Sequence, residues 1–308
     1  MEFLKFLQSI RNPVLDGFFS LITMLGEETV FILVGLVFFW CISKKQGYYL
    51  LTIGFVGTVL NQFLKLFFRV PRPWVQDPTF EIVESAREQA TGYSFPSGHT
   101  QTAVGIFGGI ARITKNKTIR IICIIICILV SLSRMYLGVH TPLDVGVSFV
   151  LATVMVFVLY PLVNKAMDSK WGMKIFLFSM IALSVLYLLF VEFFKFPCDI
   201  DAQNYASGVK NAYKILGCIL GLWLAYELDE RIVHFDTEAV WWVQILKFAL
   251  GLIPVLFVKS VLKAPINSIF GGASVADTVR YFLLTFVAAG IWPMTFKFFA
   301  KLANKKSA

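Results

Sequence analysis

The sequence contains few charged residues, and this scarcity excludes an ordinary soluble domain. Asp, Glu, Lys and Arg make up 15% of its 308 residues, whereas 57% are hydrophobic and the mean hydropathy is +0.74. Soluble domains contain about one quarter charged residues. Apolar stretches long enough to cross a bilayer recur along the whole chain, which a single signal peptide does not explain. The composition therefore predicts an all-α, polytopic helical membrane protein.

The chain also lacks the residue patterns typical of disulfide frameworks, metal sites and nucleic-acid-binding surfaces. Of its five cysteines, Cys198 stands alone in a polar loop and the others lie in apolar segments. No CxxC pair and no Cys/His spacing typical of zinc occurs, so we expect no metal ion and no other cofactor. The net charge is +9, but no basic stripe with interleaved aromatic residues is present. We therefore expect no nucleic-acid partner.

Nine membrane spans are predicted from the apolar stretches. They cover residues 28–43, 48–68, 99–113, 119–137, 142–163, 173–194, 211–227, 240–262 and 276–300. Residues 1–27 combine charges with Phe and Leu and contain Pro13, so we expect an amphipathic segment at the membrane interface. The remaining chain divides into a six-span core, 28–194, and a C-terminal part, 195–308, with about three further spans of unassigned role.

Basic residues give the predicted orientation. Lys and Arg gather in connections at 43–47, 111–120 and 164–174 and at the C-terminal end. With nine spans these connections lie on one side of the membrane, which the positive-inside rule assigns to the cytoplasm. The polar segment 69–98 and the turn near 138–141 then face outward.

Three short motifs fall at the outer ends of the predicted spans. In the first, KLFFRVPRP, Lys65 closes a span, and Arg69 and Arg72 begin the outward segment. One interpretation is a set of basic side chains that reach the membrane interface beside a helix-ending proline. The other is a set of cations for a bound anion. For Arg69, substrate contact and interface packing both stay open.

The second motif is Pro96-Ser97-Gly98-His99, directly before an apolar run. Ser97 fits the N-cap of a helix, and Gly98 leaves its backbone open to close approach. A helix N-terminus binds anions through its unpaired N–H groups, and His99 would point into that seat from the first turn. Ordinary capping beside an interfacial histidine explains the same residues.

The third motif is SRMYLGVHTPLD. Arg134 ends a span, where a cation suits the helix C-terminus. Thr141 and Pro142 fit the N-cap and first position of the next helix, so Asp144 fits a capping-box acid. Alternatively, Asp144 accepts the proton of one His140 ring nitrogen and leaves the other nitrogen free as a nucleophile. Both interpretations can hold at once.

Convergence of the three motifs at one membrane face predicts an oxyanion site with a nucleophile. The third histidine, His234, lies in a predicted cytoplasmic loop. The ordered set K-x6-R-P, P-S-G-H and S-R-x5-H-x3-D resembles the signature of the type 2 phosphatidic acid phosphatase superfamily. That superfamily includes lipid phosphate phosphatases, glucose-6-phosphatases and vanadium haloperoxidases. Every signature position is matched, and the resemblance covers the predicted core, 28–194.

By this resemblance the protein is a phosphatase that works through a phosphohistidine and without a metal ion. His140 would attack phosphorus, Asp144 would orient His140, and His99 would protonate the leaving oxygen and then activate water. The residues that would hold the phosphoryl oxygens are Lys65, Arg72, Ser97, Gly98 and Arg134. Fixed positive charge of this kind does most of the catalytic work in phosphoryl transfer.

The expected substrate is a lipid whose phosphate lies at the depth of the outer interface. Phosphatidate, phosphatidylglycerol phosphate and polyprenyl diphosphates fit, and we favour the polyprenyl diphosphates because outward-facing bacterial members often recycle such carriers. We therefore expect an integral protein of a bacterial cell membrane with an extracytoplasmic site. A soluble sugar phosphate as substrate and a lipid phosphotransferase reaction are the alternatives. A transporter or flippase is opposed by the scarcity of ionisable residues in mid-span.

Two acidic residues at the start of the first span have two interpretations. Glu27 and Glu28 fit either the rim of the site or negative charge at a helix N-terminus. The sequence leaves this choice and the oligomeric state open.

Overall fold

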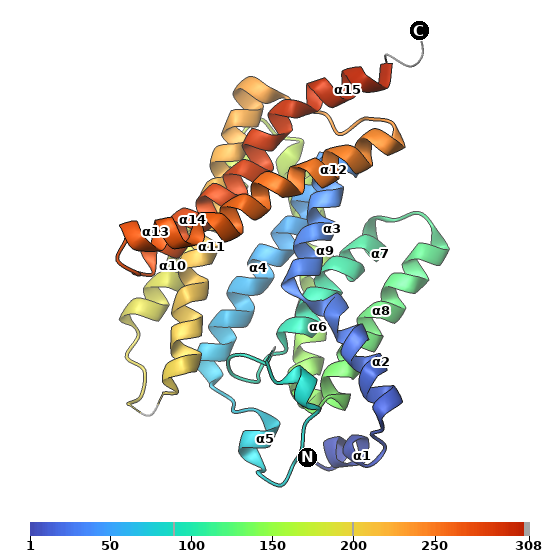
Figure 1. Ribbon diagram of the computed structural model, residues 1–308, viewed down its shortest axis with the longest axis vertical. Coiled ribbons are helices and arrows are strands. Elements are labelled where there is room, and N and C mark those ends of the chain that lie inside the picture. Colours follow the sequence, from blue (N-terminus) through green and yellow to red (C-terminus); the bar gives the residue numbers. More distant parts are fainter. Residues whose placement is uncertain (89, 199, 305–308) are drawn as a thin grey trace. The chain divides into compact units, whose positions relative to one another are not determined.

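Helices account for the regular structure of the described chain. The computed structural model describes residues 1–88, 90–198 and 200–304. Its α-helices (Figure 1) are α1 (Glu2–Ser9), α2 (Pro13–Thr23), α3 (Glu28–Val37), α4 (Lys44–Phe68), α5 (Pro73–Gln76), α6 (Gly98–Ala103), α7 (Gly109–Ile113), α8 (Lys117–Tyr136), α9 (Pro142–Met167), α10 (Gly172–Phe193), α11 (Ala202–Leu228), α12 (Trp241–Leu256), α13 (Lys263–Ile269), α14 (Val275–Phe286) and α15 (Phe296–Asn304). Shorter π-helical segments are Phe38–Ile42, Val104–Gly108, Asp229–Val233, Phe257–Val261 and Val287–Ile291, and 3-10 turns are Met24–Gly26, Glu84–Ala86 and Trp292–Thr295. The predicted all-α class is confirmed.

Six helical stretches of the described chain are long and apolar enough to cross a membrane. They are Lys44–Gln76, Lys117–Tyr136, Pro142–Met167, Gly172–Phe193, Trp241–Val261 and Val275–Leu302. The number becomes seven when the pair Pro13–Gly26 and Glu28–Ile42, bent by 51°, counts as one span. The chain is thus a polytopic membrane protein, but the structure supports fewer spans than the nine predicted.

Two of the predicted spans are helical but do not qualify as membrane-spanning helices, each for a different reason. The stretch 99–113 forms α6, a π-helical turn and α7, and together these are shorter than the roughly 20 residues that a spanning helix needs. The stretch 211–227 lies in α11, which is 27 residues long. Lys210 and Lys214 lower the hydropathy of the first half of α11, so its apolar part is too short.

The N-terminal segment, which we expect from the sequence to lie at the membrane interface, forms α1 and α2, and its place at the interface stays a prediction. The side-chain oxygen of Asn12 accepts hydrogen bonds from the backbone N–H groups of Val14 (3.1 Å) and Leu15 (3.0 Å) and caps α2. Pro13 is therefore the first residue of a helix, where proline is favoured, and does not interrupt one. Helix α2 continues into Met24–Gly26, and Pro13–Gly26 reaches spanning length only when it is counted together with Glu28–Ile42, from which it is bent by 51°.

The chain forms two compact units, each built from separate stretches of sequence. The first unit comprises Met1–Gly35, Tyr49–Leu162 and Phe196–Gly208. The second comprises Leu36–Tyr48, Val163–Lys195 and Val209–Ala308. The two units are made of stretches that alternate along the chain. The three ranges that we expect from the sequence, 1–27, 28–194 and 195–308, follow one another, and the division of roles between them stays a prediction.

Four helix ends meet at one end of the first unit. α4 and α8 finish there, and α6 and α9 begin there (Figure 1). The backbone N–H of Ser97 donates to Asp144 O (3.2 Å) and joins the starts of α6 and α9. The N–H of Val83 donates to Leu137 O (3.1 Å) and joins the connection between α4 and α6 to the end of α8. All three sequence motifs are therefore placed at this end.

Helix α1 covers the same end of the first unit. Its Leu4 is buried in an apolar cluster with Phe80, Ile82, Met135 and Val145. The cluster combines α1, the connection before α6, α8 and α9, so the N-terminal helix is packed against the elements that carry the motifs.

In the second unit α11 and α14 pack backbone against backbone. Gly217 and Gly221 stand about one turn apart on α11. A Cβ atom at Gly217 would lie 2.2 Å from Thr278 O, and one at Gly221 would lie 2.5 Å from Phe282 O. Small residues at this spacing let membrane helices approach closely. Glycine is thus required at both positions by the neighbouring helix.

Replacing Gly217 by Ala is expected to destabilise the protein by about 1–3 kcal/mol, because the new methyl group clashes with the backbone oxygen of Thr278, which the helix α14 holds in place. Gly146→Ala is the matched control, since a Cβ there meets nothing within 4 Å and alanine raises helix propensity. Thermal unfolding in detergent measures both variants. Equal melting temperatures would contradict the close packing of α11 on α14.

Candidate active site

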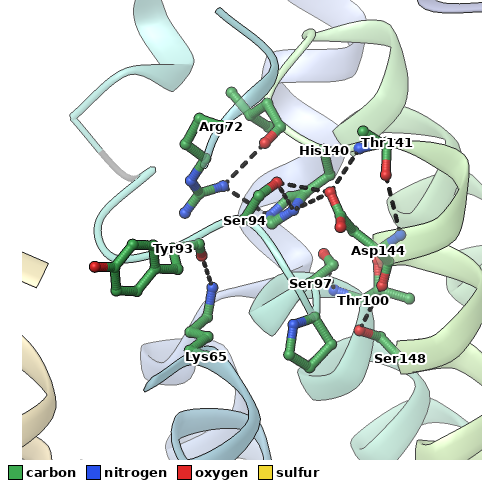
Figure 2. A network of polar contacts seen from close by, with 12 residues as sticks. Lys65, Arg72, Tyr93, Ser94, Ser97, Thr100, His140, Thr141, Asp144 and Ser148 are labelled. Carbon is green, nitrogen blue, oxygen red and sulfur yellow. Dashed lines mark hydrogen bonds and ion pairs between the residues drawn. The ribbon is translucent and has the colours of Figure 1, made fainter. Parts of the chain in front are cut away.

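Residues of the three motifs lie together at the helix ends of the first unit. In chain order they are Lys65 in the last turn of α4, Arg72 after it, Ser97, Gly98 and His99 at the start of α6, Arg134 in the last turn of α8, and His140 and Asp144 at the start of α9. Figure 2 shows the contact of Arg72 with His140 and the contacts of His140 and Asp144 with Ser94 in the segment before α6. Gly98 and His99 are partly exposed, and the other members are buried.

The Asp144 carboxylate both caps α9 and faces the His140 imidazole. Its Oδ2 accepts a hydrogen bond from the backbone N–H of Thr141 (2.8 Å), and the N–H of Asp144 donates to Thr141 Oγ1 (3.2 Å). This is the reciprocal pattern of a capping box. The same Oδ2 accepts a bond from Ser94 Oγ (2.6 Å) and lies 3.5 Å from His140 Nδ1. Both interpretations of Asp144 from the sequence therefore describe one atom.

The contact of His140 with Arg72 identifies which ring nitrogen carries the proton. Arg72 Nη1 lies 3.0 Å from His140 Nε2. A guanidinium group can only donate, so Nε2 accepts and the proton of the neutral ring is on Nδ1. Nδ1 faces Asp144 Oδ2 and Ser94 Oγ, the latter at 3.4 Å. Burial, followed by the positive charge of Arg72, lowers the pKa of His140 well below its ordinary value.

Backbone carbonyl groups hold Arg72 in place. Its Nε donates to Gly92 O (3.1 Å), its Nη2 to Thr91 O (2.7 Å) and its Nη1 to Val139 O (2.9 Å). These bonds replace water around a buried guanidinium group, which otherwise costs several kcal/mol. Arg72 therefore links the segment before α6 to the loop that presents His140.

The Lys65 ammonium group is held by the same segment. Lys65 Nζ donates to Tyr93 O, as Figure 2 shows, and the N–H of Ser94 donates to Val70 O (2.8 Å). The segment before α6 therefore folds back over the end of α4. In this way a buried lysine and a buried arginine are fixed near the same imidazole.

The start of α6 has the geometry expected of a helix cap. Ser97 Oγ accepts a hydrogen bond from the N–H of Thr100 (3.4 Å). A Cβ at Gly98 would lie 3.8 Å from Asn61 Oδ1, so this side of the helix end is uncrowded. His99 Nε2 is buried and has no hydrogen-bond partner among the described residues.

Arg134 is fully buried and only partly satisfied. Its Nη1 donates to Thr23 Oγ1 (2.6 Å), whereas its Nε and Nη2 have no hydrogen-bond partner in the described chain. Buried polar groups are almost always paired, and an unpaired one costs about 1–3 kcal/mol or more when charged. Arg134 and His99 together therefore present three buried nitrogens that are suited to an anion.

Sequence reasoning does not identify Ser94 or Thr23 as site residues. Ser94 stands in a loop without a spacing signal, although it lies three residues before Ser97. Thr23 belongs to the segment that we assign to the membrane interface from the sequence. The structure places Ser94 against Asp144 and Thr23 against Arg134.

Two other residues named from the sequence have local roles. Arg69 has a positive φ of 50° at the end of α4, and its Nη1 donates to Leu66 O (3.4 Å) within that helix. Glu28 is in the first turn of α3, as helix N-terminal charge requires. Substrate contact by either residue stays a prediction. Among the described residues, no group of three or more His, Cys, Asp or Glu side chains is arranged to hold a metal ion.

The fold and the site define a polytopic helical membrane protein with a buried imidazole among cations, and comparisons with known proteins agree with the fold. The model of the PAP2 superfamily matches residues 45–168, which include all three motifs. The model described as PAP2 superfamily phosphatase, transmembrane extension, matches residues 213–305. The chain belongs to the PAP2 superfamily, which confirms the resemblance seen in the motifs.

Several curated proteins are similar to the chain. A probable sphingosine-1-phosphate phosphatase from Dictyostelium discoideum is 30% identical over 159 residues, 47% of this chain and 38% of the relative. Sphingosine-1-phosphate phosphatase 1 of Mus musculus is 27% identical over 273 residues, 83% of this chain and 62% of the relative. An undecaprenyl-diphosphatase from Bacillus subtilis is 30% identical over 154 residues, 49% of this chain and 77% of the relative. The chain thus spans less than two thirds of the first two relatives, and no solved structure matches it significantly.

We expect nitrogen NMR of the labelled protein to show His140 with a protonated Nδ1 and an unprotonated Nε2 at neutral pH. In Arg72→Gln the pKa of His140 should rise toward its ordinary value, because a neighbouring positive charge is lost. Arg69→Gln, which removes an arginine that donates to the preceding helix, is the control and should leave this titration unchanged. An unaltered pKa of His140 in Arg72→Gln would refute the proposed contact.

Proposed function

We propose that the protein is an integral membrane enzyme that hydrolyses lipid phosphate esters through a phosphohistidine at His140. One observation carries this proposal: a buried, neutral imidazole has its Nε2 lone pair among cationic side chains and its Nδ1–H toward Asp144. An activated nucleophile with an orienting carboxylate is the arrangement that covalent catalysis requires. Membership of the PAP2 superfamily supports the same reaction.

In the first step, His140 Nε2 attacks phosphorus, a P–N bond forms and the ester P–O bond breaks. Protonated His99 gives its proton to the leaving oxygen. In the second step, water attacks phosphorus, passes a proton to His99 and releases the His140 lone pair as the P–N bond breaks. Asp144 stabilises the positive charge that His140 carries in the intermediate, through the carboxylate oxygen that faces Nδ1.

The phosphoryl oxygens bind to groups that are already fixed in the protein. Lys65, Arg72 and Arg134 supply positive charge. Ser97 and the N–H of Gly98 supply hydrogen-bond donors at the start of α6. Because these groups are held before substrate arrives, they stabilise the developing charge without reorganisation.

The favoured substrate from the sequence is a polyprenyl diphosphate or a related lipid phosphate, with the site on the extracytoplasmic side. The similarity to an undecaprenyl-diphosphatase of Bacillus subtilis supports this substrate class. A sphingosine-1-phosphate type of substrate is the second candidate. The similarity to the mouse sphingosine-1-phosphate phosphatase 1 extends over 273 residues and so reaches beyond the three motifs.

Phosphate release by the purified protein tests the reaction and separates the substrates. The panel contains undecaprenyl diphosphate, sphingosine-1-phosphate, phosphatidate and glucose 6-phosphate. We expect His140→Ala to lower kcat by more than about 10³-fold, beyond the loss of one electrostatic donor, and Asp144→Asn to be severely impaired but folded. His234→Asn is the matched control, since His234 is exposed and its φ of 48° suits asparagine.

Near-full turnover by His140→Ala would exclude His140 as the nucleophile. Preference for glucose 6-phosphate would favour a sugar phosphatase. Transfer of labelled phosphate to a second lipid without release of free phosphate would favour a phosphotransferase.

We also expect activity to survive treatment with EDTA, because buried cationic side chains supply the positive charge that phosphoryl transfer needs. Phosphate release is measured with and without the chelator and then with added Mg²⁺. Loss of activity that Mg²⁺ restores would contradict a metal-independent reaction.

A further inference from the structure

The hydroxyl group of Thr23 holds one nitrogen of Arg134. Thr23 ends α2 and is buried, and its Oγ1 lies 2.6 Å from Arg134 Nη1. Arginine has no acceptor atom, so Nη1 donates and the hydroxyl oxygen accepts. Hydrogen bonds from a charged donor are shorter and stronger than neutral ones. This contact joins residues 111 positions apart in the chain.

The bond to Thr23 determines which edge of the guanidinium group is open. Nε and Nη2 of Arg134 are buried and have no hydrogen-bond partner in the part of the chain described. These two nitrogens form the side-on edge, whose parallel N–H groups bind a phosphate with two hydrogen bonds. Rotation of the guanidinium group to satisfy them elsewhere would break the bond to Thr23.

Further contacts fix the N-terminal segment against the helices that carry the motifs. Arg11 Nε donates to Tyr136 O (3.0 Å), and Tyr136 OH donates to Asp16 Oδ1 (2.8 Å). A Cβ at Gly26 would lie 2.8 Å from His99 O, so the turn after α2 is in close contact with the start of α6. Thr23 is therefore presented to Arg134 by a segment bound at both of its ends.

We propose that Thr23 is a positioning residue for Arg134, and that the segment Pro13–Gly26 holds Thr23 in place for this role. The proposal rests on the proposed phosphatase function, in which Arg134 binds a phosphoryl group. Thr23 does not contact the substrate. It holds Nη1 so that Nε and Nη2 face the phosphate oxygens.

The first test compares Thr23→Val, which keeps the volume of the side chain and removes the acceptor, with Thr23→Ser, which keeps the acceptor. We expect Thr23→Val to lower kcat/KM roughly tenfold and Thr23→Ser to restore most of it. Thr58→Val is the matched control, since Thr58 is exposed and its hydroxyl donates to Gly54 O of its own helix. Melting temperatures identify any variant that is merely unfolded, in which case Thr23→Ala replaces Thr23→Val.

A double-mutant cycle shows whether Thr23 acts through Arg134. Lysine keeps the charge but lacks the side-on edge, so Thr23→Val should cost less than about twofold in an Arg134→Lys background. The same tenfold loss in both backgrounds would mean that Thr23 acts elsewhere and would overturn the proposal.

Calorimetric binding of orthovanadate separates failure of this proposal from failure of the proposed function. Wild-type protein that binds orthovanadate without releasing phosphate from any substrate would refute the phosphatase. Roughly tenfold weaker vanadate binding by Thr23→Val would then still support the positioning role. Equal vanadate affinity and equal kcat/KM in wild type and Thr23→Val would overturn that role. Wild-type protein that binds no vanadate would overturn both.

Discussion

Burial of positive charge at the ends of α4 and α8 is the constraint on which the site depends. Lys65 and Arg72 are 6% exposed and Arg134 is 0% exposed. Taking such groups out of water costs several kcal/mol each unless the protein replaces the lost hydrogen bonds. The segment before α6 does so for Lys65 and Arg72 with backbone carbonyl groups. Arg134 keeps two open nitrogens, which a phosphate group is suited to fill.

The same positive charge determines the protonation state of His140. Arg72 donates to His140 Nε2, so the imidazole ring stays neutral and Nε2 carries no proton. Asp144 faces the opposite nitrogen and also caps α9, which fixes its own position. The charges that we propose to bind phosphate and the tautomer of His140 that we propose to attack it are therefore one electrostatic arrangement.

The second family match covers the part of the chain beyond the three motifs. Residues 213–305 match the transmembrane extension of PAP2 superfamily phosphatases and contain none of the three motifs. In the second unit, Gly217 and Gly221 of α11 pack directly on α14. The observed contacts of this region are those of close helix packing, and its functional role stays unassigned.

Hydropathy was sufficient to predict the membrane class but not the number of spans. Apolar runs must become helices in lipid because every backbone group needs an internal partner. The limits of a span depend on local detail that hydropathy misses. Asn12 caps α2 and makes Pro13 a first helical residue, which extends the apolar N-terminal segment. Conversely, Lys214 shortens the apolar part of α11.

The sequence by itself determined the residues that local spacing identifies. These are the capping pair Thr141 and Asp144, and the cations and histidines of the three motifs. Tertiary structure decided the contacts between distant segments. Ser94 meets Asp144 across 50 residues, Arg72 meets His140 across 68, and Thr23 meets Arg134 across 111. A single hydroxyl group carries no periodic signal, and the tautomer of a histidine depends on whichever donor the fold brings to it. Such roles follow from the packing of helix ends and not from the order of residues.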